Sequence, residues 1–264
     1  MRSIAAPGRC LGGVFRSALL CIVLLPPSPA KAADVFIATA GTASGSGALL
    51  GDGTATVRPG LLALHTRVWL RYQDNRVYVM QSEGRDRLLV LIPSAWLAPV
   101  VEFSTSSGSA PRDVVVLPDD ELYVSLHGGS DVVRVDAYDG EVLARIDLGD
   151  LDDDGIPDMT KMILHEGRLY VLCERLGGAT AGTVAVIDVL TESPIDMDPA
   201  TAGLQGLDLA GSVPVDLLRV GERLIVPSSA GIEELNLLTG RRRILLAADD
   251  LGGDVQGLAL RSNC

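Results

Sequence analysis

The sequence predicts an all-β protein, a β-propeller of about five four-stranded blades. A strand phrase returns every 45 to 55 residues, and each copy is followed by small or polar residues and a second alternating run. A fixed period in this range indicates a repeat fold, and four short strands per repeat are typical of a propeller blade. The copies of the phrase are residues 76–79, 121–124, 168–171 and 223–226.

Four blades follow in order along the chain, because alternating apolar and polar residues predict half-buried strands and no long stretch has helical periodicity. Turn residues such as Asn75, Asp139-Gly140 and Glu166-Gly167 separate the strands. The predicted strands are 62–70, 76–81, 87–92 and 100–103; 113–117, 121–126, 131–137 and 141–146; 160–164, 168–173, 183–189 and a short segment near 195; and 215–220, 223–226, 231–237 and 241–246.

The two ends of the chain supply a further blade. Residues 35–39, 48–50 and 54–57 read as three strands, and residues 255–261 read as one. We expect the terminal strand to close the ring by pairing with the N-terminal segment, which removes two bare sheet edges. The alternative is a truncated six- or seven-bladed propeller, in which a longer relative carries further blades.

The first 32 residues predict a signal peptide, which leaves residues 33–264 as the propeller domain. Arg2, Arg9 and Arg16 form a positive segment, residues 18–25 are apolar, and Ala30-Lys31-Ala32 fits the small-x-small rule for cleavage. The apolar run is too short to cross a bilayer. An uncleaved anchor is the alternative, and lipidation at Cys21 is disfavoured because Leu20 precedes it. We therefore expect an exported protein, periplasmic or on the cell surface.

The predicted mature chain is strongly acidic. It carries 18 basic against 34 acidic residues, a net charge of −16. Nucleic acids and anionic membranes are bound through Lys and Arg contacts, so this charge argues against both as partners. We expect a protein or a polar ligand as the partner, bound at one face of the ring.

An Asp-rich segment predicts a calcium site. Carboxylates at positions 1, 3, 5 and 9 with Gly155 at position 6 follow the spacing of calcium-binding loops, and hard oxygen ligands suit Ca²⁺. Position 12 is Lys161, so the bidentate Glu of an EF-hand is missing. We expect a structural ion that ties the linker between two blades, although a solvated acidic turn has the same pattern. The expected ligands are Asp150, Asp152, Asp154, the carbonyl of Ile156, and Asp158.

A second set of carboxylates could line the channel. Asp113, Asp216 and Asp254 each lie near the start of a predicted inner strand. Gathered around one metal they would make a hydrolase, whereas bonds to nearby amides would give them a structural role. The structural role is favoured, and the hydrolase is kept as the alternative function.

The histidines and cysteines point to no further chemistry. His65, His127 and His165 lie in three different blades and could share a metal only at the channel. Cys173 and Cys264 could pair in an oxidising compartment, but Cys173 has the pattern of a packing position.

Several phrases resemble the YVTN-, NHL- and gluconolactonase-like β-propellers. The resemblance rests on Leu122-Tyr123-Val124-Ser125, Val133-Arg134-Val135-Asp136, Leu169-Tyr170-Val171 and Val184-Ala185-Val186-Ile187-Asp188. The segments 152–159 and 251–254 are most similar to exported proteobacterial propeller proteins and lipoproteins of unassigned function. Lactonase-type members hold a metal with Glu, Asn and Asp. This chain has only Asn75, Asn236 and Asn263, so the metal set is not reproduced.

These observations predict an exported, non-enzymatic propeller that acts as a binding or scaffold module stabilised by calcium. The alternatives are the metal-dependent, lactonase-like hydrolase and a truncated propeller without its own activity.

Overall fold

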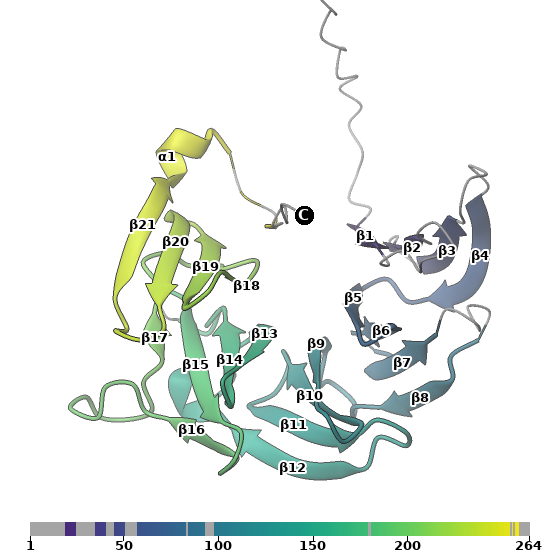
Figure 1. Ribbon diagram of the computed structural model, residues 1–264, viewed down its shortest axis with the longest axis horizontal. Coiled ribbons are helices and arrows are strands. Elements are labelled where there is room, and N and C mark those ends of the chain that lie inside the picture. Colours follow the sequence, from purple (N-terminus) through teal and green to yellow (C-terminus); the bar gives the residue numbers. More distant parts are fainter. Residues whose placement is uncertain are drawn as a thin grey trace, which may run out of the picture.

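The computed structural model describes residues 19–24, 35–40, 45–50, 57–82, 84–92, 98–178, 181–253, 255 and 257–258. These residues form five antiparallel sheets around a common centre, as Figure 1 shows. Four sheets have four strands, and the fourth sheet has a short fifth strand. The predicted all-β propeller architecture is therefore present in the described part of the chain.

Within each sheet the strands follow one another in chain order, from the centre of the ring to its rim. The first sheet has β1 (Leu19–Leu24), β2 (Val35–Ala40), β3 (Gly45–Leu50) and β4 (Val57–Leu64); the second has β5 (Val68–Gln73), β6 (Arg76–Gln81), β7 (Arg87–Leu91) and β8 (Val101–Ser104); the third has β9 (Pro111–Val116), β10 (Glu121–Leu126), β11 (Asp131–Asp136) and β12 (Val142–Asp147).

The last two sheets are less regular at their edges. The fourth has β13 (Met159–His165), β14 (Arg168–Cys173), β15 (Thr183–Asp188) and β16 (Ser193–Ile195), with β17 (Leu207–Asp208) also paired to β15; the fifth has β18 (Leu218–Arg219), β19 (Arg223–Ser228), β20 (Gly231–Asn236) and β21 (Arg242–Ala247). A 3₁₀ turn, η1 (Gly149–Leu151), and a four-residue helix, α1 (Ala248–Leu251), are the helical elements of the described chain.

Several predicted strands have other bounds in the structure, and two differences change how strands are assigned to sheets. The predicted strand 62–70 is divided, because β4 ends at Leu64 and β5 begins at Val68, so its halves belong to two sheets. The terminal strand was expected to pair with the N-terminal segment, but β2 has β3 on one side and, on the other, β1, which lies inside the predicted signal peptide. Most of residues 255–261 lie outside the described residues.

The core lies between neighbouring sheets, which explains why the recurring phrase is continuously apolar. Leu122 and Val124 of β10 pack in a cluster with the second sheet, whereas Tyr123 packs in a cluster with the fourth. All three side chains are fully buried. Burying a Leu or Val side chain completely stabilises a fold by about 1.5–3 kcal/mol. The middle strands are therefore buried on both faces.

Tight turns fix the registers of the hairpins. Glu166 and Gly167 both have positive φ, at 48° and 73°, and join β13 to β14 with His165 paired to Arg168. Two successive left-handed residues are typical of a type I′ turn, whose twist matches that of antiparallel strands. The same geometry recurs at Asp74 and Asn75 between β5 and β6.

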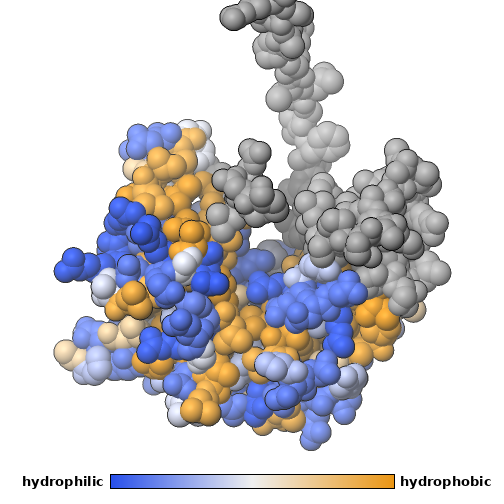
Figure 2. All heavy atoms as spheres, in the orientation of Figure 1, coloured by the Kyte–Doolittle hydropathy of each residue, from blue (hydrophilic) through white to orange (hydrophobic). Residues whose placement is uncertain are grey.

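The rim of the last sheet is apolar. Ile244, Leu245 and Leu246 of β21 are exposed by 48%, 39% and 48%. Hydrophobic side chains gather over this strand at the upper left of Figure 2.

Candidate functional site

The connections between strands divide over two faces of the ring, because successive strands are antiparallel. One face carries the links between sheets together with the turns from the second to the third strand of each sheet. Residues 127–130, 148–158 and 174–178 lie there, and we call this side the acidic loop face. The opposite side carries the other hairpin turns, and we call it the turn face.

The Asp-rich segment forms a compact loop after η1. Leu151 is buried and anchors the start of the loop, and Gly155 adopts a φ of 77°, which suits a residue without a side chain. Asp152 accepts a hydrogen bond from the Gly177 amide at 3.3 Å. Asp154 packs against the same glycine, where a Cβ would lie only 2.3 Å from the Asp154 Cγ. The loop is therefore fitted to the β14–β15 connection.

A histidine lies between two carboxylates beside this loop. The His127 Nδ1 is 3.9 Å from an Asp158 oxygen, and its Nε2 is 3.7 Å from a Glu174 oxygen. Asp158 also accepts a hydrogen bond from the Leu176 amide at 2.7 Å. Burial raises the pKa of Asp158 above its usual range, against the opposing effect of that amide. These contacts join three connections on the acidic loop face.

A small polar cavity opens on the other side of the Asp-rich loop. It has a volume of about 170 Å³ and lies between the link from β12 to β13 and the fourth sheet. Three carboxylates and one guanidinium line it, so its charge is negative. Its polar lining residues are Asp150, Asp153, Asp208, Arg175, Thr183 and Gln205.

Two lining groups of this cavity, the Arg175 Nε and the Thr183 hydroxyl, lack a hydrogen-bond partner in the described part of the chain. Thr183 is 1% exposed, and its hydroxyl makes no hydrogen bond within the described part of the chain. Gly206 lies directly over it, where a Cβ would come within 2.4 Å of the hydroxyl oxygen. A buried hydroxyl without a partner costs roughly 1–3 kcal/mol, so a bound water or ion that satisfied it would be stabilising.

The structure separates the predicted calcium ligands. Asp150 lines the cavity, whereas Asp152 and Asp154 contact Gly177 in the β14–β15 connection. Asp158 faces His127. Asp154 accepts a hydrogen bond from the amide of Ile156. The four carboxylates form no group of three within metal-ligand distance in the described chain. Several of them instead accept hydrogen bonds from backbone amides.

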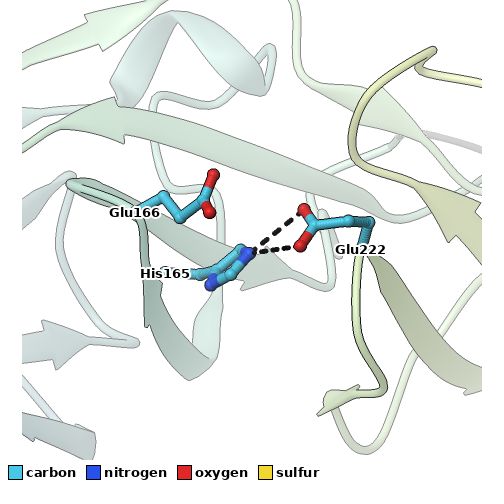
Figure 3. A group of neighbouring side chains, drawn as sticks. All are labelled: His165, Glu166 and Glu222. Atoms are coloured by element: carbon cyan, nitrogen blue, oxygen red, sulfur yellow. Dashed lines mark hydrogen bonds and ion pairs between the residues drawn. The ribbon is translucent and has the colours of Figure 1, made fainter.

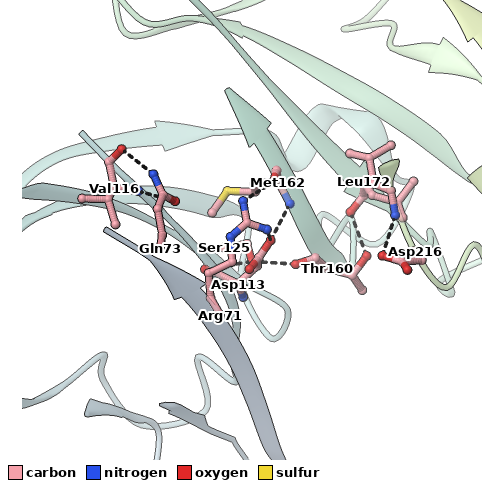
Figure 4. A network of polar contacts seen from close by, with 10 residues as sticks. Arg71, Gln73, Asp113, Val116, Ser125, Thr160, Met162, Leu172 and Asp216 are labelled. Atoms are coloured by element: carbon pink, nitrogen blue, oxygen red, sulfur yellow. Dashed lines mark hydrogen bonds and ion pairs between the residues drawn. The ribbon is translucent and has the colours of Figure 1, made fainter. Parts of the chain in front are cut away.

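Two of the predicted channel carboxylates accept hydrogen bonds from backbone amides far along the chain. Asp113 is fully buried, and its Oδ2 accepts hydrogen bonds from Arg71 at 3.3 Å and from the Met162 amide at 2.8 Å (Figure 4). Asp216 accepts one from the amide of Leu258 at 2.9 Å. The third, Asp254, lies outside the described residues.

The surrounding polar contacts have the same character. Gln73 of β5 bonds to both the amide and the carbonyl of Val116 in β9, at 3.3 Å each, and Ser125 donates to the Thr160 carbonyl at 2.9 Å (Figure 4). These polar side chains therefore join successive sheets close to their inner strands.

Two arrangements were not expected from the sequence. The cavity combines residues from three separate connections, and no local spacing indicates that Asp208 or Thr183 would join Asp150. The other is His165 with Glu166 and Glu222 on the turn face, whose ligand atoms all lie within 4.8 Å of one another. Among described residues this is the one group of three His, Cys, Asp or Glu side chains with that geometry. The adjacent His165-Glu166 pair was a signal in the sequence, but its partner Glu222 follows 56 residues later.

The remaining predicted residues are apart from these groups. His65 bonds to its neighbour Thr66, so the three histidines do not share one site. Cys173 is a free thiol, buried in the core between the third and fourth sheets. Cys264, with which it could pair, lies outside the described residues.

Comparison with known proteins supports the fold. Virginiamycin B lyase from Staphylococcus aureus, in a catalytically inactive form with quinupristin, superimposes with a TM-score of 0.57 at 12% identity, covering 86% of this chain and 73% of the lyase. A streptogramin B lyase gives 0.56 at 13%, covering 87% and 74%. A protein of unknown function from Bacteroides caccae gives 0.52 at 17%, covering 79% and 71%. At such identities the likeness concerns the propeller fold alone.

No protein-family model matches the sequence, and no curated protein matches it. Within the described residues, no helix is long and apolar enough to span a membrane.

Proposed function

We propose that the chain is an exported, non-enzymatic β-propeller that acts as a binding or scaffold module and holds Ca²⁺ on its acidic loop face. The observation that carries the proposal is the negatively charged cavity beside the Asp-rich loop. Its carboxylate, amide and hydroxyl oxygens are hard donors of the kind Ca²⁺ prefers. The ion would fix connections at which a protein or polar ligand binds.

Two sets of donors could hold this ion. The predicted loop set is Asp150, Asp152, Asp154, the Ile156 carbonyl and Asp158. To converge on one ion, three of these carboxylates would have to give up the hydrogen bonds that they accept from backbone amides. The cavity set shares Asp150 and adds Asp153, Asp208, Gln205 and Thr183. We favour the cavity set, because its buried hydroxyl gains a partner when an ion or its water is bound.

Thermal unfolding tests the proposal, using protein expressed from its full coding sequence with millimolar Ca²⁺ or with EGTA. Binding to the native state raises the midpoint by mass action. A rise that Asp208→Asn abolishes supports the cavity set, and a rise that only Asp152→Ala with Asp154→Ala abolishes supports the loop set. Asp119→Asn, an exposed acid near the turn face, is the matched control. No calcium-dependent rise in the unsubstituted protein would refute the calcium role.

The non-enzymatic assignment is supported by the channel carboxylates. Asp113 is engaged by Arg71 and a backbone amide, and Asp216 is engaged by two backbone amides. Such carboxylates are positioned to join strands.

Export is supported by the leader pattern, and N-terminal sequencing of secreted protein tests it. A mature chain that begins at Ala33 is expected, and retention of Met1 would overturn the signal-peptide assignment.

The ring closes, in this proposal, through the C-terminal segment. Asp113 of the third sheet accepts a hydrogen bond from the amide of Met162 in the next inner strand. Asp216, which lies two residues before β18 of the fifth sheet, accepts one from the amide of Leu258 in the same way. By this analogy, Leu258 would correspond to Met162 and belong to the inner strand of a following blade. Once a leader is removed, the edge of β2 that β1 occupies becomes available to residues 255–261.

A proline substitution tests closure. Leu258→Pro removes the amide hydrogen that Asp216 accepts and opposes strand pairing. We expect a lower unfolding midpoint and faster proteolysis of the first sheet in the secreted protein. An unchanged midpoint and unchanged cleavage would instead favour an open, truncated propeller.

A further inference from the structure

The turn face carries a group of metal-ligand side chains outside the site described above. His165 is the last residue of β13, Glu166 begins the turn to β14, and Glu222 lies in the turn between β18 and β19 (Figure 3). The two turns belong to the fourth and fifth sheets. Their side chains meet across the boundary between these sheets.

Backbone conformation places each of the three residues. The type I′ turn at Glu166 and Gly167 holds Glu166 next to the histidine that precedes it. Gly221, with a φ of 58°, turns the chain so that Glu222 extends toward the neighbouring sheet. Figure 3 shows the imidazole between the two carboxylates.

The distances are close to those of a zinc site. The His165 Nε2 lies 3.2 and 3.1 Å from the two oxygens of Glu222, and all three ligand atoms lie within 4.8 Å of one another. Zn–N and Zn–O bonds of about 2.0–2.2 Å put neighbouring ligand atoms of a tetrahedral ion about 3.4 Å apart. The His165–Glu222 separation already agrees with this value. Glu166 is exposed, so a change of rotamer can bring its carboxylate closer.

The charges of the group favour a cation. Two carboxylates face one imidazole, and the Glu166 carboxylate has no hydrogen bond or ion pair with another described residue. The guanidinium groups closest in sequence to Glu222 are engaged elsewhere. Arg223 pairs with Glu234 at 3.2 Å, and Arg219 bonds to the Gly221 carbonyl at 3.0 Å. A neutral imidazole offers its lone pair to a metal.

We propose that His165, Glu166 and Glu222 bind a zinc ion that links the turns of the fourth and fifth sheets. One nitrogen and two carboxylate oxygens suit Zn²⁺ better than Ca²⁺, which prefers six or more oxygen ligands. Three protein ligands leave the fourth coordination position open to water or to a partner's side chain. The site is independent of the calcium proposal, because no residue of the acidic loop face takes part.

Titration with zinc alone tests the site, with protein expressed from its full coding sequence and stripped of metal by chelation. We expect one zinc per chain, measured by competition with a chromophoric chelator. His165→Ala, Glu166→Gln and Glu222→Gln should each weaken binding at least tenfold, since ligand removal is more severe than the loss of outer-shell partners, which costs 10–100-fold. Cobalt bound in place of zinc should give the intense visible absorption of a four-coordinate ion.

Two variants serve as controls. Glu141→Gln removes an exposed acid in another hairpin turn of the turn face, and His127→Ala removes the histidine of the acidic loop face. Both should leave zinc affinity unchanged, and unfolding midpoints measured without zinc show whether each variant is folded. Stoichiometric zinc that survives His165→Ala and Glu166→Gln would overturn the proposal, as would the absence of zinc binding by the unsubstituted protein.

Discussion

Asp113→Ala should destabilise the propeller by removing a link between three inner strands. The carboxylate is fully buried and accepts hydrogen bonds from Arg71 in β5 and from the Met162 amide in β13. A buried amide left without an acceptor costs about 1–3 kcal/mol. The Arg71 side chain is 28% exposed, so its ion pair adds only about 0.5–1 kcal/mol. We expect a loss of about 3 kcal/mol in the free energy of unfolding.

Urea and thermal unfolding monitored by tryptophan fluorescence measure this loss. Trp69 is a local probe, because it lies in β5 with Arg112 stacked 4.4 Å from its ring. A change of 1 kcal/mol shifts the midpoint of a domain of this size by about 2–4 °C, so Asp113→Ala should melt about 6–12 °C lower.

Two substitutions make the result interpretable. Asp113→Asn keeps an oxygen for the Met162 amide and should cost only about 1 kcal/mol. Asp119→Ala removes an exposed acid and should change stability by less than about 0.5 kcal/mol. If Asp113→Ala unfolds at the same urea concentration as Asp119→Ala, the carboxylate does not hold the inner strands and our reasoning is wrong.

Three further predictions follow from buried groups. Glu233 is fully buried and accepts hydrogen bonds from the amides of Ala210 and Gly211, so Glu233→Ala should cost about 3 kcal/mol and Glu233→Gln less, as measured by urea unfolding; equal losses would contradict this role. Gly206→Ala should cost about 1–3 kcal/mol and abolish any calcium-dependent rise in midpoint, because the added methyl group meets the Thr183 hydroxyl; a calcium response equal to that of the unsubstituted protein would exclude the cavity set. Burial raises the pKa of the Cys173 thiol to about 12, whereas a thiol in an unfolded chain ionises near pH 8.5. Stability should therefore be unaffected by this group below that pH and fall as the pH rises toward 12, and Cys173→Ala should flatten the fall; an equal fall in both proteins would assign it to other groups.

The recurring strand phrase was sufficient to predict most of the architecture. Each copy is buried on both faces between two sheets, so its apolar character is imposed by packing and is visible in the sequence. The strands of the third and fourth sheets agree with the prediction within about two residues, which is the usual uncertainty of element ends. The predicted strand 62–70 was wrong, because the apolar residues before His65 and those after Arg67 belong to different sheets. Only the three residues between them link the two sheets, which is too short an interruption to recognise in the sequence.

The candidate sites were harder to predict, because their members come from different connections. Asp150 is part of a recognisable spacing, but Thr183 and Asp208 join it only when β17 pairs with β15. Glu222 reaches His165 only because the fourth and fifth sheets are neighbours. Spacing in the sequence indicates which residues can share a local turn. It does not indicate which turns of a ring meet.

The links made by Asp113 and Asp216 have a direction along the chain. Each carboxylate accepts a hydrogen bond from an amide that is synthesised later, 49 residues further on for Asp113 and 42 residues further on for Asp216. During synthesis or export, a sheet can therefore form its own hairpins early, but its hydrogen bonds to the next sheet form only when that sheet has emerged. Assembly should proceed in one direction around the ring, and the last sheet to emerge should remain the most open to exchange until the final link is made.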